Sequence, residues 1–164
     1  MNDPADFEAF TTWAQGEINA MGQHAHTSGL VATEARGQMM WAVPQKAFIG
    51  KVWPEQDRRA SYWVISGEGL PTDHIAADLA TTPRDAARHF ALKWQLESTH
   101  LSSLSGQARA SRDDDAADVD WTEIGKTLER QAELLYDYVQ RDDLWDDAAQ
   151  RRFAELTSGG PPDS

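Results

Sequence analysis

The stretch QMMWAVPQKAFIGKVWPEQDRRASYWVIS, residues 38–66, decides the fold class. Three runs within it, at 39–44, 47–53 and 61–66, are rich in the aromatic and β-branched side chains that favour strands. The polar segment between the last two runs is typical of a surface loop. We therefore predict a three-stranded antiparallel meander, with one face packed on helices and the other partly wet.

Helical patterns flank this stretch on both sides. Apolar residues recur at helical spacing over residues 7–21, and we expect that helix to end at Gly22. A second helix is expected to begin at Pro83, with Thr82 as its cap, and a third near Asp120. The predicted class is α+β: an N-terminal helix, a three-stranded antiparallel sheet and two long C-terminal helices packed on one face.

The chain of 164 residues has the length of one domain, which we place at residues 1–157. Residues 102–119 are Ser-rich and then acidic, so we expect a mobile acidic loop inside the domain. The tail at 158–164 is composed of Ser, Gly, Pro and Asp and is expected to be disordered. The absence of cysteine excludes disulfides and thiolate chemistry.

Negative charge is concentrated near the end of the chain. Residues 113–147 carry 13 acidic side chains against three basic ones, which accounts for −10 of the net charge of −12. Such a segment favours a basic protein surface or cations as partner and argues against nucleic acid and anionic membranes. The alternative is that the acidity serves only solubility.

The location expected by default is the cytoplasm. The first residues are acidic and polar and lack the basic and apolar regions of a signal peptide. No apolar run approaches the roughly 20 residues that a membrane span needs. We accordingly predict no membrane association.

One aromatic side chain near the C-terminus is surrounded by carboxylates. Trp145 lies between two pairs of aspartates, an arrangement typical of an aromatic anchor with steering charge. The candidate protein-binding residues are Tyr138, Asp142, Asp143, Trp145, Asp146 and Asp147. The alternative is that Trp145 folds back onto the core and the aspartates are merely solvated.

A second candidate site follows the last predicted strand. Glu68, Asp73 and His74 are polar groups of the kind that perform acid–base chemistry, in a pocket lined by Trp41 and Trp63. No nucleophile accompanies them, and no motif for phosphate, cofactor or calcium binding is present. The alternative is a turn-rich loop in which Asp73 caps a short helix at 74–79.

The end of the first helix carries a candidate metal-binding pair. His24 and His26 could hold a metal ion if an extended backbone placed both on one side. No third ligand is evident nearby, so we predict neither a metal nor any other cofactor.

Several segments resemble a bacterial family known as domain of unknown function 4826. These segments are 41–44, 62–67 running into 70–73, 83–86 opening a helix that reaches Trp94, 130–135 and 142–145. The resemblance covers about three quarters of the chain and departs at Glu68–Gly69, where this sequence is one residue longer. It implies a bacterial cytoplasmic protein and brings no catalytic residues.

Three functions remain open from the sequence. We rank first a binding module, such as an inhibitor or immunity-type partner that neutralises a basic protein. An enzyme using Glu68, Asp73 and His74 for hydrolysis or proton transfer ranks second, and a homodimeric structural protein is the third. We therefore expect a binding protein more than an enzyme.

Overall fold

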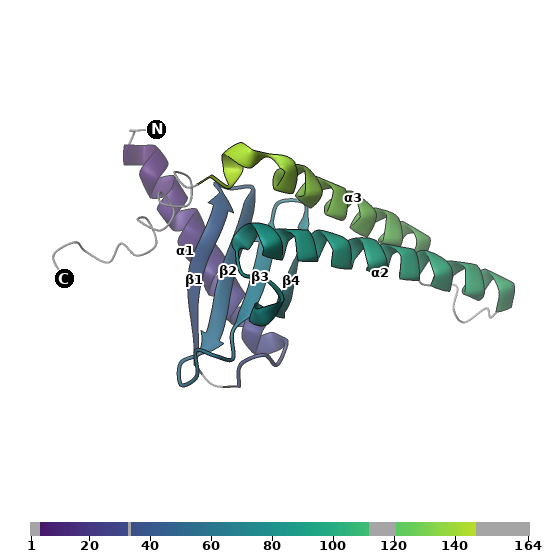
Figure 1. Cartoon of the computed structure of the whole chain (residues 1–164), viewed down its shortest axis with the longest axis horizontal. Coiled ribbons are helices and arrows are strands. Elements are labelled where there is room, and N and C mark those ends of the chain that lie inside the picture. The colour runs from purple at the N-terminus through teal and green to yellow at the C-terminus, as the bar shows by residue number, and fades with distance from the viewer. Residues whose placement is uncertain (1–3, 33, 112–120, 147–164) are drawn as a thin grey trace.

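A computed structural model describes residues 4–32, 34–111 and 121–146 of the chain (Figure 1). Its elements are, in order, α1 (Pro4–Thr27), β1 (Ala35–Val43), β2 (Ala47–Pro54), β3 (Tyr62–Gly67), β4 (Leu70–Ala76), a 3-10 turn at Ala77–Leu79, α2 (Pro83–Ser111), α3 (Trp121–Gln140) and a second 3-10 turn at Asp142–Leu144. The α+β class is as predicted.

The sheet has four antiparallel strands in the order β1-β2-β3-β4, and the prediction of three was wrong. The fourth strand comes from residues 70–76, which we expected to be a loop. Gly67 pairs with Leu70 across a tight hairpin, and Gly69 adopts the left-handed φ of 74° that favours glycine. Pro71 is tolerated because β4 is an edge strand.

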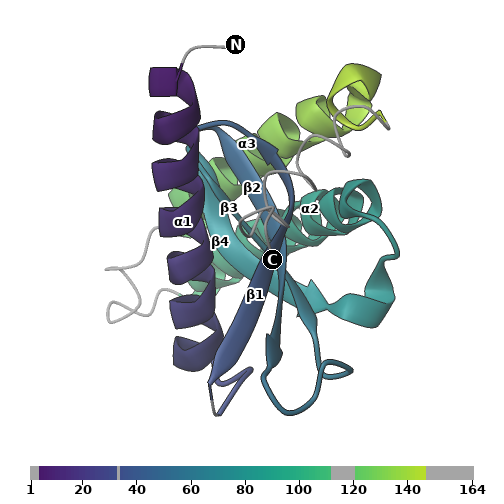
Figure 2. The same cartoon turned by 90° about the vertical axis from the view of Figure 1, so that its left-hand side faces the viewer.

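Helices cover both faces of the sheet, so the expectation of a partly wet face is also wrong (Figure 2). On one face, α1 lays Met21 against Gly50 of β2, whose missing side chain makes room for the thioether. On the opposite face, α2 contacts β4 where Trp94 meets Asp73. Helices α2 and α3 pack side by side on that face, as predicted for the two long C-terminal helices.

Two helices are longer than the sequence suggested. Helix α1 continues through Gly22, because Met21 and Ala25 on either side of it are buried against the sheet. It ends at Thr27, followed by Gly29 at a φ of 74°, a typical C-terminal cap. The propensity cost of one helix glycine, roughly 1 kcal/mol, is smaller than the gain from burying those two side chains.

Helix α2 begins as predicted and continues into the segment that we expected to be a loop. The amide of Asp85 donates to Thr82 Oγ1 over 3.1 Å, which is the expected cap. The helix then includes residues 102–111, the first part of the expected loop. Packing against α3 reaches the start of this part: Gly125 lies close to Leu101 and Ser102 of α2, and Ser98 donates to the Gly125 carbonyl over 2.8 Å. The rest of that loop and the 158–164 tail lie outside the described residues.

Tryptophan dominates the core between the layers. Trp41, Trp63 and Trp94 are each at most 1% exposed and rank among the largest fully buried side chains. Each indole N–H has an acceptor, which removes the penalty of burying it. Helices α2 and α3 therefore pack over a core in which these three indole N–H groups are all hydrogen-bonded.

Candidate functional site

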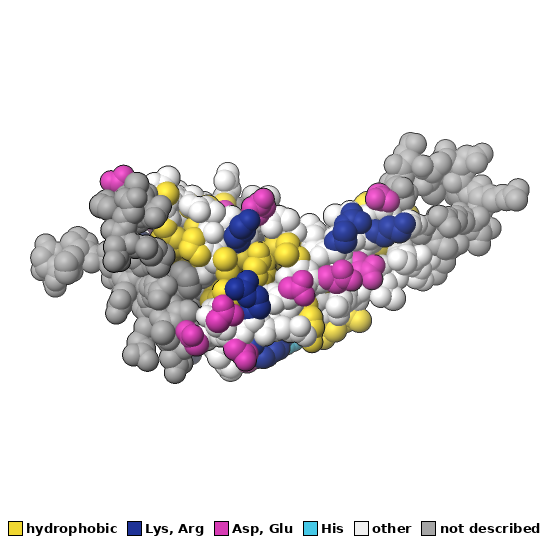
Figure 3. Space-filling model, turned by 90° about the horizontal axis from the view of Figure 1, so that it is seen from above, with side chains coloured by type: hydrophobic (Ala, Val, Ile, Leu, Met, Phe, Trp, Pro, Cys, Tyr) yellow, Lys and Arg dark blue, Asp and Glu magenta, His cyan; other side chains and the backbone are white. Residues whose placement is uncertain are grey.

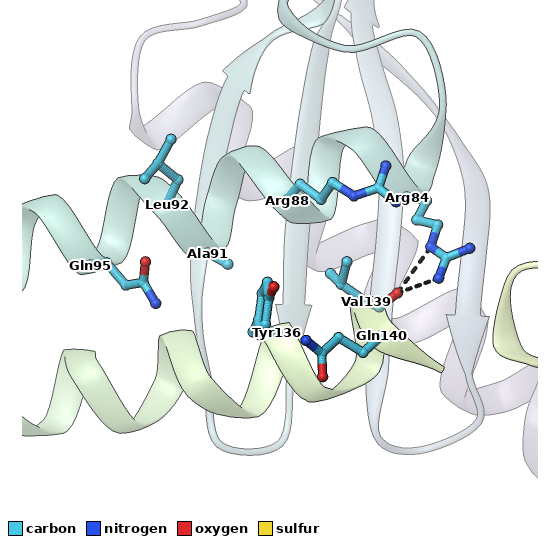
Figure 4. A pocket seen from close by; sticks show the side chains of 8 residues that line it. All are labelled: Arg84, Arg88, Ala91, Leu92, Gln95, Tyr136, Val139 and Gln140. Carbon is cyan, nitrogen blue, oxygen red and sulfur yellow. Dashed lines mark hydrogen bonds between the residues drawn. The ribbon is translucent and has the colours of Figure 1, made fainter. Parts of the chain in front are cut away.

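The outer surface of the α2–α3 pair is hollowed into a shallow groove of about 360 Å³ (Figure 4). Arg84, Arg88, Leu92 and Gln95 line it from α2, and Tyr136 and Gln140 line it from α3, with Ala91 and Val139 between them. Leu92 and Tyr136 are 53% and 46% exposed, so both present apolar surface at the groove. The groove thus offers an apolar surface to an outside partner.

Arg84 joins the two helices at one end of the groove (Figure 4). Its Nε and one terminal nitrogen donate to the Val139 carbonyl over 2.9 and 2.6 Å, and that terminal nitrogen also reaches Asp142 at 2.6 Å. The Val139 carbonyl lies in the last turn of α3, where carbonyls lack partners within the helix. Arg84 therefore ties the end of α3 to the start of α2.

Carboxylates follow one row of α3 beside this groove. Glu129, Glu133 and Asp137 are spaced four residues apart, so they lie along one face of the helix, and all three are exposed. None of them forms an ion pair with another residue in the described ranges. Seen from above, acidic side chains gather near exposed hydrophobic ones, with basic side chains interspersed (Figure 3).

The predicted aromatic anchor is not exposed. Trp145 is only 5% exposed and stacks on Trp41, with ring centroids 4.0 Å apart and planes 4° apart. Its indole N–H donates to the Tyr138 carbonyl over 2.7 Å, and that of Trp41 donates to the Leu144 carbonyl over 2.8 Å. The Trp145 indole thereby bonds to a carbonyl in the last turn of α3, and the Trp41 indole bonds to one in the 3-10 turn that follows, which is the physical reason for the fold-back. Trp145 belongs to the core.

The described aspartates around Trp145 differ in their surroundings. Asp142 pairs with Arg84 at 2.6 Å and Asp143 with Arg141 at 3.2 Å. Asp146 is exposed, and Asp147 lies outside the described residues. Residues 121–146 carry seven acidic and three basic side chains, a balance of −4, so most of the charge of 113–147 falls on residues that the structure does not describe.

The aromatic pair expected to line a catalytic pocket is also core. Trp41 is fully buried under Trp145. Trp63 is fully buried too, and its N–H is shared between the carbonyls of Ala77 and Ala80 at 3.2 and 3.1 Å. Neither indole presents a face to a groove.

The three candidate acid–base residues lie apart. Glu68 is exposed at the β3–β4 hairpin, 3.8 Å from Lys46. Asp73 and His74 are neighbours in β4, so their side chains point to opposite faces of the sheet. Within the described residues, Glu68 therefore lies apart from the other two, and Asp73 and His74 do not face one another.

Asp73 has a different role from the one predicted. Its carboxylate accepts from Lys93 Nζ and Trp94 Nε1, both at 2.9 Å, and from the amide of His74 at 2.7 Å. The 3-10 turn that follows β4 has no side-chain cap, so the expected helix cap is wrong as well. Asp73 instead fastens β4 to α2 through a half-buried ion pair.

His74 meets a second histidine on the α1 side of the sheet. Its Nδ1 lies 3.1 Å from Nε2 of His24, in the last turn of α1, and the ring of Tyr62 is edge-on to it. Burial is the main cause that lowers the pKa of His74, and Asp73 opposes that shift. His26 is exposed and points away from His24, because residues two apart lie on opposite sides of a helix.

Comparison with known proteins places the chain in a family. The family model described as Domain of unknown function (DUF4826) matches residues 10–145. The chain belongs to the DUF4826 family. No curated protein and no solved structure matches it.

The match spans nearly all of the described fold. It begins within α1 and ends at Trp145, the indole that closes over Trp41. The DUF4826 domain therefore includes the groove, the row of carboxylates and the histidine pair. No described helix of this DUF4826 chain is long and apolar enough to cross a membrane.

Sequence reasoning missed the residues that partner Asp73 and His74. Lys93 and Trp94 follow one another on α2, and nothing in their spacing points to a strand twenty residues earlier. The sequence points to His24 as a candidate metal ligand, but with His26 as its partner. Only the pairing of α1 and α2 with opposite faces of β4 in this DUF4826 fold brings these groups together.

Proposed function

We propose that this protein is a protein-binding module that docks a cationic protein on the outer surface of the α2–α3 pair. The observation that supports it is the juxtaposition of exposed Leu92 and Tyr136 with the carboxylate row of Glu129, Glu133 and Asp137. An apolar patch flanked by unpaired charge is the pattern of an interface with an anchor and a rim.

The negative charge of the α3 carboxylates indicates the kind of partner that would bind this surface. A partner with apolar side chains on one face and Lys or Arg beside them would bury Leu92 and Tyr136 and pair with the carboxylates. A second copy of this chain would bring the same carboxylates and a net charge of −12 to the contact, which disfavours self-association. Nucleic acid would be repelled for the same reason.

In the cell, the protein would act as an inhibitor or immunity-type partner of a basic protein in the cytoplasm. The overall negative charge would accelerate encounter with a cationic surface, and the groove would supply the buried contact. This places the docking site on α2 and α3 instead of around Trp145. The core role of Trp145 supports the change of position.

The test compares two charge-reversal variants as bait in affinity capture from cell extract. One variant carries Glu129→Lys, Glu133→Lys and Asp137→Lys. The control carries Glu8→Lys, Asp57→Lys and Asp78→Lys, three exposed acids outside α2 and α3, so its net charge is the same. We expect a basic protein to be retained by the wild type and the control and lost from the α3 variant by at least about tenfold.

The salt dependence of binding distinguishes the proposed contact from non-specific retention. Binding through the carboxylate row and the groove should weaken at high ionic strength but persist in part, because the apolar contact is not screened. A captured protein that both variants lose equally would show that only net charge matters and would contradict the proposed site. Light scattering that shows a dimer for the wild type and a monomer for the α3 variant would also contradict the proposal.

A further inference from the structure

The histidine pair lies away from the proposed docking groove. His24 projects from the last turn of α1 and His74 from edge strand β4, and these residues are fifty positions apart in the chain. Both rings are half-buried, and each is carried by a regular element. We propose that His24 Nε2 and His74 Nδ1 form a binding site for one divalent transition-metal ion of the Zn²⁺, Ni²⁺ or Cu²⁺ class.

The distance between the two nitrogens fits a shared metal ion. Zinc binds histidine nitrogens at about 2.0–2.1 Å, so two nitrogens at a tetrahedral angle are separated by about 3.3 Å. The observed separation is 3.1 Å. Rotation of the two imidazole rings would aim both lone pairs at one ion, at nearly the nitrogen separation that is already present.

Tyr62 restrains the ring of His74, and the opposite side of the pair, near Ser28, is open to solvent. Tyr62 packs edge-on against His74, with ring centroids 6.0 Å apart, and limits the rotation of that imidazole. Ser28 Oγ lies 3.5 Å from His24 Nε2 on the exposed side. In the described part of the chain no group of three or more His, Asp or Glu side chains converges, so water and the Ser28 hydroxyl would complete the coordination.

The two facing nitrogens can both offer a lone pair to a metal ion. A metal ion binds the neutral imidazole through the lone pair of a ring nitrogen. At present one of the two facing nitrogens donates a proton to the other. Ligation needs only that this proton move to the other nitrogen of its own ring, so the neutral pair would bind the ion without a net release of protons.

The ligand type selects the class of ion. Imidazole suits Zn²⁺, Cu²⁺ and Ni²⁺, whereas Mg²⁺ and Ca²⁺ prefer oxygen ligands. Affinity should follow the usual order, with Cu²⁺ above Ni²⁺ and Zn²⁺. The strong net negative charge of the chain raises the local concentration of any cation.

The experiment counts nitrogen ligands on Cu²⁺ bound to the untagged full-length chain after treatment with a chelator. Pulsed electron paramagnetic resonance should report two imidazoles in the wild type and one in His24→Gln or His74→Gln. The control is His26→Gln, which removes an exposed histidine two residues from the site and should leave two. Calorimetric titration with Ni²⁺ and Zn²⁺ should show one saturable site that either site variant loses.

A purely structural role for the pair would give a different result. His24→Gln or His74→Gln would then lower the melting temperature without metal, and adding Ni²⁺ would raise it equally little in the wild type and in both variants. Spectra that show one imidazole in the wild type, or that change with His26→Gln, would also overturn the proposal. These readouts do not depend on the docking groove, so the two proposals can fail separately.

Discussion

The stacked indoles of Trp41 and Trp145 hold the end of α3 against the sheet. Each donates a hydrogen bond to a carbonyl near that end, and Tyr138 packs edge-on to Trp41. The contact joins residues 104 positions apart and lies at the C-terminal limit of the family match. A residue that resembled a binding anchor therefore has a stabilising role.

Replacement of Trp145 should test that role directly. We expect Trp145→Ala to lower the free energy of unfolding by about 3–5 kcal/mol, because it removes a buried indole and leaves a cavity over Trp41. Urea denaturation measures the change. The control is Trp53→Ala, a half-buried indole whose main specific contact is Arg58 over its ring, with an expected loss of about 1 kcal/mol. Equal losses would contradict the assignment of Trp145 to the core.

The histidine pair predicts a pH dependence of stability in the metal-free protein. Burial lowers the pKa of His74; Asp73 beside it opposes this shift, while His24 from α1 and Lys93 from α2 reinforce it. The native state thus binds fewer protons than the unfolded chain between the two pKa values. The stabilisation is complete above about pH 6.5 and is lost as the pH falls through the lower native value.

Thermal unfolding between neutral and mildly acidic pH, with a chelator present, measures this effect. The wild type should lose stability more steeply on acidification than His74→Gln, in which the group is absent. His26→Gln should keep the steep slope of the wild type. Parallel curves for the wild type and His74→Gln would contradict the lowered pKa.

At the scale of elements, helices α2 and α3 are joined at both ends of their contact. Ser98 bonds to the Gly125 carbonyl near the start of α3, and Arg84 bonds to the Val139 carbonyl at its end. On the other side of the sheet, Ser66 of β3 donates to Glu17 of α1 over 2.5 Å. Specific polar contacts thus fix each helix layer on an otherwise apolar interface.

Removing the Arg84 contact should loosen the end of α3. We expect Arg84→Ala to lower the free energy of unfolding by about 1–3 kcal/mol, because the charged hydrogen bonds to the Val139 carbonyl are lost. Hydrogen exchange should increase in the last turn of α3 more than in β2. Asp142→Asn is the matched control: its carboxylate side chain is 90% exposed, so the change should cost less than about 1 kcal/mol.

At the scale of the whole molecule, an outer helix pair is carried on a Trp-rich core. The sheet is covered by α1 on one face and by α2 and α3 on the other (Figure 2). The docking surface uses side chains that the core does not need: Leu92 lines the groove, and Leu96 lies one turn further along α2, outside the groove lining; they are 53% and 63% exposed. The docking surface and the fold should therefore be separable by mutation.

A double substitution tests this separation. Leu92→Glu with Leu96→Glu should change the free energy of unfolding by no more than about 0.5 kcal/mol, because both side chains project into solvent. The same variant should abolish retention of the basic partner in the capture experiment. The control Leu135→Ala, at a fully buried position of α3, should cost about 2–5 kcal/mol. Strong destabilisation by the double variant would show that the surface belongs to the core.

The sequence by itself determined the features that depend on near neighbours. Hydrophobic spacing placed the three helices and three strands, and Thr82 with Pro83 marked the start of α2, because capping and periodicity act within a few residues. The fourth strand escaped prediction, since Pro71 and the glycines before it look like a loop until β3 offers an edge to pair with. The family was also evident from local segments.

Only the tertiary structure decided which distant residues meet. Trp41 with Trp145, His24 with His74 and Asp73 with Lys93 are pairs from separate elements, and no local pattern in the chain couples them. Whether Trp145 is exposed depends on a surface that is built only when α3 packs on the sheet. Burial and long-range contact are properties of the packed layers, and for that reason the chain order alone could name candidate side chains but not their partners.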